Sequence, residues 1–185
     1  MIRVAINGFG RIGRNTFKAI VERGLDKEIE VVAVNDLTDA ATLAHLLKYD
    51  TVFGRFEGTV EATGSVLTVN GKKIQVIAEK DPALLPWKKL KIDVVLECTG
   101  RYTKDGAARA HVTAGAKRVI VSAPTKGGDV KTFVLGVNDR AYKGEDVISN
   151  ASCTTNCVSP VTRVIQEAFG IERAMLTTIH AVTAE

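Results

Sequence analysis

The chain has 185 residues, of which 45% are hydrophobic and 25% charged, so its composition is that of a folded protein rather than of a disordered or low-complexity one. The net charge is +4, but Lys and Arg are scattered among acidic residues, and this pattern does not favour nucleic-acid binding. The sequence shows no run apolar enough to span a membrane and no signal-peptide core in its first residues. We therefore expect a cytoplasmic protein without a membrane or specific nucleic-acid partner.

The first 35 residues predict one βαβ crossover. Residues 3–6 form a β-branched run, residues 11–21 place apolar side chains at helical spacing, and residues 30–34 form a nearly continuous apolar strand. Gly24 marks the end of the helix. Continuous apolar strands are typical of parallel sheets that are covered on both faces. Residues 40–47 then predict a second helix.

Between residues 59 and 78 the pattern changes to alternating strands. SVLTV and KKIQVIA are joined by Asn70 and Gly71, a pair suited to a type I′ hairpin turn. We expect an antiparallel hairpin inserted into the parallel sheet.

The β-α-β alternation returns after Pro82 and Pro86. DVVLECTG predicts a strand, about 104–114 a helix, KRVIVSAP a strand, and FVLGV and DVISN two short strands. A helix that opens at ASCTTNC runs to about Phe169 and ends at Gly170, and ERAMLTTIHAV predicts a further strand.

These elements together predict an α/β fold. We expect a Rossmann-type doubly wound, mostly parallel sheet with the hairpin insertion in residues 1–150, and the start of an α+β catalytic domain in residues 151–185. Because the strand-like pattern continues almost to the last residue, we expect a truncated second domain.

A glycine motif lies between the first strand and the first helix. Gly8, Gly10 and Gly13 form G-x-G-x-x-G, which permits a tight turn and brings backbone N–H groups close to a pyrophosphate at the helix N-terminus. Asp36 ends the second strand, where a carboxylate can bind both ribose hydroxyls and repel a 2′-phosphate. The motif predicts NAD as cofactor. Glycine-rich turns also serve packing alone, and Asp36 could equally cap the next turn.

Two further strand ends carry hydroxyl side chains. Thr99 in ECTG and Ser122 in SAP lie at the carboxyl ends of parallel strands, the edge where doubly wound sheets bind ligands. Both are candidate cofactor neighbours. The alternative is that they are ordinary turn hydroxyls that cap backbone groups.

The heptapeptide ASCTTNC contains two of the three cysteines. Cys153 lies in the first turn of the predicted helix, with Ser152 or Asn150 as the cap, and the helix dipole favours its thiolate. We predict that Cys153 is a nucleophile and that Cys157, one turn deeper, is a packed bystander. A zinc site is disfavoured because no second cysteine pair follows, and no metal is expected.

Among the three histidines, His180 is the candidate base. His45 and His111 fall inside predicted helices, where surface or partly buried positions are expected. His180 ends the strand after the cysteine helix, so a returning strand could bring its ring to the sulfur. A purely structural histidine remains the alternative from the sequence pattern.

With NGFGRIGR, NDL at residues 35–37, ASCTTNC and TTIHAVTAE in order, the whole chain resembles the amino-terminal half of phosphorylating glyceraldehyde-3-phosphate dehydrogenases. ASCTTNC is the most specific of these motifs and is shared with erythrose-4-phosphate dehydrogenases. The resemblance implies Cys153 as nucleophile and His180 as its activating base. It further implies NAD contacts at Arg11, Ile12, Asp36, Lys80 and Ser122, and substrate or phosphate contacts at Ser152, Thr154 and Thr183.

The implied reaction is the oxidative phosphorylation of D-glyceraldehyde 3-phosphate to 1,3-bisphosphoglycerate in glycolysis and gluconeogenesis. It proceeds through a thiohemiacetal and a thioester on Cys153, with inorganic phosphate as second substrate. The family's chain is about twice as long and forms a homotetramer, so we expect this chain alone to be inactive. Alternatives are an erythrose-4-phosphate dehydrogenase and a non-catalytic NAD-binding fragment. Val182 replaces an aromatic residue that many members carry, a change that does not argue against function.

Overall fold

Within residues 1–181, the strands pair into one nine-stranded sheet and one small two-stranded sheet. The computed structural model describes residues 1–181. The strands are β1 Ile2–Asn7, β2 Ile29–Asn35, β3 Tyr49–Asp50, β4 Gly54–Arg55, β5 Val60–Thr63, β6 Val66–Val69, β7 Lys72–Ile77, β8 Val94–Glu97, β9 Arg118–Val121, β10 Lys131–Thr132 and β11 Val147–Ser149. The α-helices are α1 Arg11–Glu22, α2 Ala40–Lys48, α3 Trp87–Leu90, α4 Ala110–Thr113 and α5 Cys153–Phe169. Short 3₁₀ turns span Leu25–Lys27, Pro82–Leu84, Ala107–Arg109 and Asp139–Ala141.

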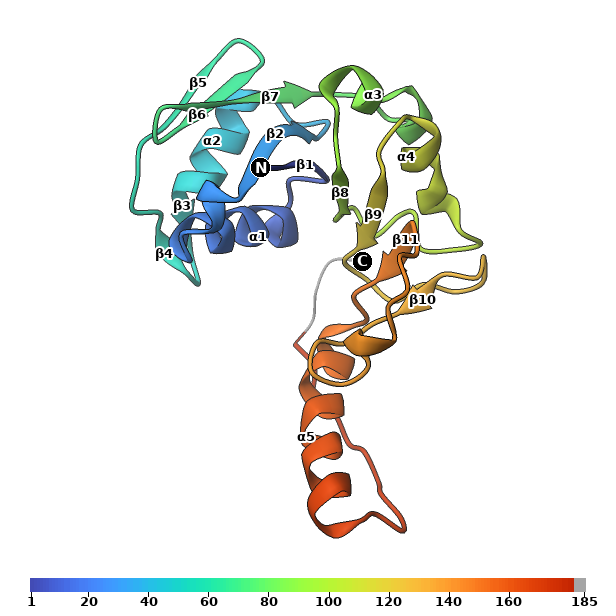
Figure 1. Cartoon of the computed structure of the whole chain (residues 1–185). Coiled ribbons are helices and arrows are strands. Elements are labelled where there is room, and N and C mark those ends of the chain that lie inside the picture. The colour runs from blue at the N-terminus through green and yellow to red at the C-terminus, as the bar shows by residue number, and fades with distance from the viewer. Residues whose placement is uncertain (182–185) are drawn as a thin grey trace.

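The large sheet has the order β10-β11-β9-β8-β1-β2-β7-β6-β5 (Figure 1). All neighbours from β10 to β7 are parallel, and β6 and β5 add antiparallel to β7. The chain runs from β1 outward to β2 and later returns to place β8 on the other side of β1. The order therefore reverses between β1 and β8, where doubly wound sheets bind ligands. The predicted Rossmann-type fold is confirmed.

Apolar side chains of β1 and its neighbours fill a core on each face of the sheet. One face packs against α1 and α2 through Ile6, Phe17, Val34 and Leu43. The opposite face packs around Trp87, together with other buried residues of β8, β9 and β11. Burial on both faces explains why these strands read as continuous apolar runs.

The predicted hairpin turn between β6 and β7 is confirmed. Asn70 has φ 50° and Gly71 has φ 79°, and a type I′ turn requires positive φ at both positions. Asn70 also uses its side chain, because Oδ1 accepts a hydrogen bond from the Thr59 N–H at 3.0 Å. The turn thereby fixes the register in which β5, β6 and β7 pair.

Two expectations for the middle of the chain are wrong. Residues 133–137 do not form a strand, because the Asn138 side chain bonds the Val134 N–H and the Thr132 C=O, which a neighbouring strand would otherwise pair. The helix expected over residues 104–114 begins only in the turn at residues 107–109. Asp105 and Gly106 adopt positive φ of 50° and 71°, and a right-handed helix cannot include residues in this conformation.

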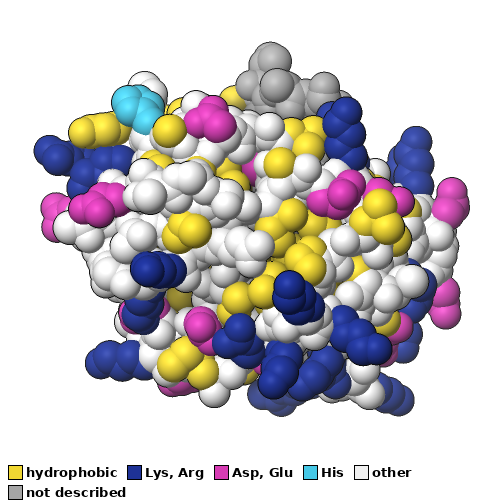
Figure 2. Space-filling view, turned by 90° about the horizontal axis from the view of Figure 1, so that it is seen from above, with side chains coloured by type: hydrophobic (Ala, Val, Ile, Leu, Met, Phe, Trp, Pro, Cys, Tyr) yellow, Lys and Arg dark blue, Asp and Glu magenta, His cyan; other side chains and the backbone are white. Residues whose placement is uncertain are grey.

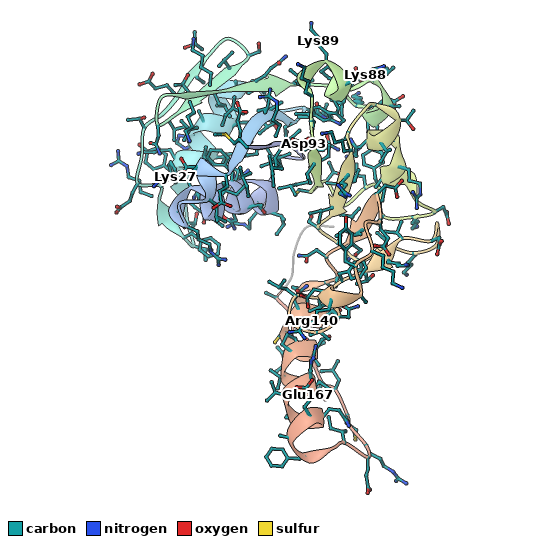
Figure 3. All side chains as sticks on the ribbon, in the orientation of Figure 1. Lys27, Lys88, Lys89, Asp93, Arg140 and Glu167 are labelled. Atoms are coloured by element: carbon teal, nitrogen blue, oxygen red, sulfur yellow. The ribbon has the colours of Figure 1, made fainter. Side chains whose placement is uncertain are left out.

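The strand expected after α5 is also wrong for the residues described. Residues 172–181 pair with no other strand in residues 1–181, and an extended segment becomes a strand only through such pairing. α5 projects from the body of the sheet (Figures 1 and 3), and its Val161, Val164 and Phe169 are exposed. No helix in residues 1–181 combines the length and the apolarity needed to cross a membrane.

We predict that Gly71→Ala destabilises the fold by about 1 kcal/mol, because an L-residue with a Cβ is strained in the left-handed region. Urea denaturation followed by circular dichroism measures the loss. Asn70→Asp is the matched control, since Asp tolerates positive φ and keeps an oxygen that can accept from the Thr59 N–H, and we expect it to stay within about 0.5 kcal/mol. Equal midpoints for Gly71→Ala and the natural chain would contradict this account of the turn.

Candidate active site

Two glycines at the turn between β1 and α1, Gly8 and Gly13, leave no room for a side chain. A Cβ on Gly13 would lie 2.2 Å from the Gly8 carbonyl oxygen, and one on Gly8 would lie 2.8 Å from the backbone nitrogen of Thr99. Gly8 also has φ 87°. The N-cap residue Gly10 offers no side-chain cap to α1. The turn thus brings backbone N–H groups to the surface at the positive end of a helix, as a pyrophosphate site requires.

Asp36 follows β2 at the same edge of the sheet. Its Oδ2 accepts from the Phe9 N–H at 2.8 Å, and its Oδ1 accepts from the Thr38 N–H at 3.0 Å. A carboxylate has about four acceptor sites, so lone pairs remain for ribose hydroxyls. Asp36 is therefore both a turn-forming residue, as the alternative interpretation held, and a usable acceptor. The cap of α2 is a different residue, Asp39.

These residues open onto a cavity of about 580 Å³ at the switch point of the sheet. Five of the predicted cofactor residues line it: Gly8, Gly10, Asp36, Lys80 and Thr99. Sequence reasoning missed its other lining residues, which are Asn7, Asn35, Leu37, Glu79, Cys98, Arg101 and Tyr102. Close-packed glycines, an uncapped helix start and a carboxylate with spare acceptor capacity fit a dinucleotide.

The remaining predicted cofactor residues do not line the cavity: Arg11, Ile12, Gly13 and Ser122. The Arg11 side chain turns to Asp50 and bonds both carboxylate oxygens at 3.1 Å. Backbone N–H groups of Phe53 and Val52, and then Arg11, lower the pKa of Asp50 to about 2. Arg11 can therefore meet the cofactor with its backbone while its side chain fixes the segment after α2.

Buried polar side chains support the cavity from below. Glu97 ends β8 and His111 lies in α4, and His111 Nε2 is 2.8 Å from Glu97 Oε2. The expectation that His111 is at most partly buried is wrong, because the ring has 0% exposure and is held by hydrogen bonds. A sequence signal existed for part of this cluster: Asn7, Asn35 and Glu97 each interrupt an apolar strand at its carboxyl end.

α5 begins at the cysteine motif, as predicted. Ser152 is the N-cap, and its hydroxyl accepts from the Thr155 N–H at 3.0 Å. Ala151 before it has φ 64°, an uncommon conformation for a residue other than glycine, and its N–H donates to the Ser149 hydroxyl at 3.1 Å. This strained entry turns the chain from the sheet edge into α5, so that Cys153 stands exposed in the first turn.

Cys153 and His180 are in hydrogen-bond contact. The Sγ and Nε2 atoms are 3.2 Å apart, and His180 Nδ1 is 2.8 Å from the carbonyl oxygen of Ala181. A carbonyl only accepts, so Nδ1 carries a proton and the Nε2 lone pair faces the thiol. The hydrogen bond to His180 lowers the pKa of Cys153, with smaller contributions from the N–H and hydroxyl of Thr154. This pair has the geometry of an activated nucleophile.

The other cysteines differ from this pair. Cys157 is exposed, so the expectation that packing shields it from solvent is wrong for the described residues. Cys98 is partly buried beside Ser122 and Glu97, and burial raises the pKa of its thiol to about 11. Within residues 1–181 no three His, Cys, Asp or Glu side chains gather as metal ligands. Thr183, a predicted substrate contact, lies outside the described residues, as does Val182.

Comparisons with known proteins agree with this geometry. Residues 2–105 match the family model described as glyceraldehyde 3-phosphate dehydrogenase, NAD binding domain, and residues 152–185 match the C-terminal domain model of the same family. The chain is 53% identical over 184 residues to the cytosolic glyceraldehyde-3-phosphate dehydrogenase of Trypanosoma brucei brucei, covering 100% of this chain and 54% of that protein. Identity to the dehydrogenase of Geobacillus stearothermophilus is 56%, covering 98% and 54%. The chain spans about half the length of these relatives.

We predict that iodoacetamide at neutral pH modifies Cys153 well before Cys98, because a lowered pKa increases the thiolate fraction and a raised pKa decreases it. His180→Ala should move the pH profile of Cys153 alkylation to higher pH and slow the reaction at neutral pH at least about threefold. Peptide mass spectrometry resolves the two cysteines.

His45→Ala is the matched control, since His45 lies on α2 and makes its ring contact with Tyr49. It should leave the Cys153 profile unchanged. Identical Cys153 profiles for His180→Ala and the natural chain would show that His180 does not activate the thiol.

Proposed function

The chain belongs to the glyceraldehyde-3-phosphate dehydrogenase family, and on that premise we propose that it is the amino-terminal part of an NAD-dependent phosphorylating aldehyde dehydrogenase of glycolysis. The substrate is D-glyceraldehyde 3-phosphate and the product 1,3-bisphosphoglycerate. The observation that carries the proposal is the 3.2 Å contact between Cys153 Sγ and His180 Nε2 at the start of α5. Residues 1–150 form the cofactor domain in this proposal, and residues 151–185 begin the catalytic domain.

The residues of the chain perform the acyl chemistry. His180 Nε2 takes the thiol proton, and the Cys153 thiolate attacks the aldehyde carbon to form a thiohemiacetal. The Cys153 N–H and the protonated His180 ring stabilise the oxyanion. The His180 ring gives its proton to the oxyanion, which completes the thiohemiacetal hydroxyl, and the neutral ring takes this proton back when the thiohemiacetal is oxidised. Ser152 and Thr154, beside the nucleophile, contact the substrate or the phosphate, and so does Thr183.

Bound NAD supplies the hydride acceptor that turns the thiohemiacetal into a thioester. Gly8, Gly10, Gly13 and the backbone of Arg11 and Ile12 hold the pyrophosphate in this proposal, and Asp36 binds the ribose. Lys80, Thr99 and Ser122 are the remaining contacts. Inorganic phosphate attacks the thioester carbonyl, which releases the acyl phosphate and returns the Cys153 thiolate.

We also propose that the complete enzyme is a cytoplasmic homotetramer and that residues 1–185 alone are inactive. Support for the location comes from the Trypanosoma relative, which is named cytosolic. Support for the assembly is the family resemblance.

The view in Figure 2 shows acidic and basic side chains together on the face seen from above, with Lys and Arg gathered along one edge.

The activity is tested with a chimera. The chain is joined to the carboxy-terminal segment of the Geobacillus stearothermophilus relative, starting after the aligned region, and NADH formation is measured with glyceraldehyde 3-phosphate and phosphate. We expect phosphate-dependent turnover that Cys153→Ser reduces by at least about a thousandfold. Cys157→Ser is the matched control and should retain turnover. Faster turnover of erythrose 4-phosphate would replace the proposed substrate, and no turnover of either aldehyde would refute the enzyme.

Cofactor choice is tested by Asp36→Ala. We expect NAD affinity to fall about tenfold and the preference for NAD over NADP to narrow, because the ribose acceptor and the repulsion of a 2′-phosphate are lost together. Asp39→Ala is the matched control three residues later; it removes the cap of α2 and should lower stability without changing the preference. Isothermal calorimetry with both nucleotides measures the effect. An unchanged preference in Asp36→Ala would contradict the assignment.

A further inference from the structure

Three side chains form a buried relay beneath the cavity, and we define Trp87, His111 and Glu97 as this relay. Trp87 Nε1 donates to His111 Nδ1 at 3.0 Å, and His111 Nε2 lies 2.8 Å from Glu97 Oε2. Their side chains are at most 1% exposed. An indole N–H only donates, so His111 Nδ1 must accept, and the ring proton lies on Nε2 and points to Glu97.

Glu97 connects the relay to two walls of the cavity. Its Oε2 also accepts from Asn7 Nδ2 at 2.5 Å, and its Oε1 accepts from the Thr99 N–H at 2.8 Å and from the Thr99 hydroxyl at 2.5 Å. Asn7 and Thr99 line the cavity, whereas no residue of the relay does. The backbone of Thr99 is also the surface against which the Gly8 turn packs without room for a Cβ. A shift of Thr99 would therefore displace the turn.

Asn7 extends the network to a third wall. Its Oδ1 accepts from Asn35 Nδ2 at 2.6 Å, and Asn35 in turn bonds the backbone of Glu79 in both directions, at 2.8 and 2.9 Å. Lys80 follows directly, and its carbonyl accepts from the Tyr102 hydroxyl at 2.8 Å. The walls formed by the Gly8 turn, the Thr99 segment and the Lys80 segment are all linked through one carboxylate.

We propose that His111 is a positioning residue for the dinucleotide cavity and that the relay couples occupation of the cavity to Trp87. This inference rests on the proposed NAD site. Without the His111 donor, Glu97 Oε2 keeps only Asn7, and a buried carboxylate that has lost a donor draws its other donors into new positions. Those donors are the groups that shape the cavity. Losing the His111 N–H therefore weakens NAD binding, although His111 does not touch NAD.

The test compares two replacements of the same ring. His111→Leu removes the donor and keeps an apolar volume, whereas His111→Gln keeps an N–H close to the Nε2 position. NAD binding is measured by calorimetry, and circular dichroism verifies the fold. We expect the dissociation constant to rise about tenfold in His111→Leu and to stay within about threefold in His111→Gln. His45→Leu, at an exposed histidine of α2, is the control and should bind as the natural chain does.

A second readout needs no substitution. Trp87 is the single tryptophan of the chain, is fully buried and does not line the cavity. Its emission should therefore change as NAD is titrated into the natural chain, with the same dissociation constant as in calorimetry. Emission that stays constant at saturating NAD overturns the coupling, and it does so even if His111→Leu does not fold.

The outcomes separate the two proposals. If the natural chain does not bind NAD, the proposed cofactor site fails and this inference fails with it. If the natural chain and His111→Leu bind NAD equally, the positioning role alone is overturned. Equal losses in His111→Leu and His111→Gln would show that the ring serves only packing, which also overturns it.

Discussion

The buried carboxylate of Glu97 is the constraint on which the cofactor side of the molecule depends. A carboxylate removed from water is costly unless hydrogen-bond donors replace its hydration. Glu97 is 1% exposed, and its donors come from β1, from α4 and from the segment after β8. The charge is satisfied only when these three parts of the chain have docked. The same docking places the carboxyl ends of β1 and β8 next to each other, which is where the cavity opens.

The tight turns around the cavity follow from this arrangement. Once Glu97 holds the Thr99 segment against the end of β1, the backbone of that segment occupies the space where a side chain at Gly8 would lie. Gly13 then packs against the carbonyl of Gly8, so that α1 starts directly at the cavity. Glycine at these positions is thus a consequence of close backbone approach. The same approach brings the helix N-terminus to a bound phosphate.

Sequence patterns predicted the parts of the structure that local chemistry determines. Positive φ at Asn70 and Gly71, the cap at Ser152 and the end of α5 at Gly170 all follow from the preferences of single residues. The patterns failed where a distant or unusual contact decided the outcome. Asn138 takes the backbone bonds that a strand over residues 133–137 would have used. His111 looked like an ordinary helix residue, because its partners lie 14 and 24 residues earlier and cannot be read from helical periodicity.

The Cys153 region and the cofactor cavity differ in how far apart in the sequence their contacting residues lie. The position of Cys153 depends on local features, namely the Ser152 cap and the first turn of α5, and one longer contact, to His180 27 residues later, lowers the pKa of its thiol. ASCTTNC could therefore indicate the candidate nucleophile from seven residues. The cofactor cavity depends on hydrogen bonds that span 28 to 90 residues, such as Asn35 to Asn7 and Asn7 to Glu97. The entropic cost of closing loops of this length is offset only by the contacts of the assembled sheet. The cavity is therefore a property of the whole fold, whereas the reactive thiol is a property of one helix start and the residue that reaches it.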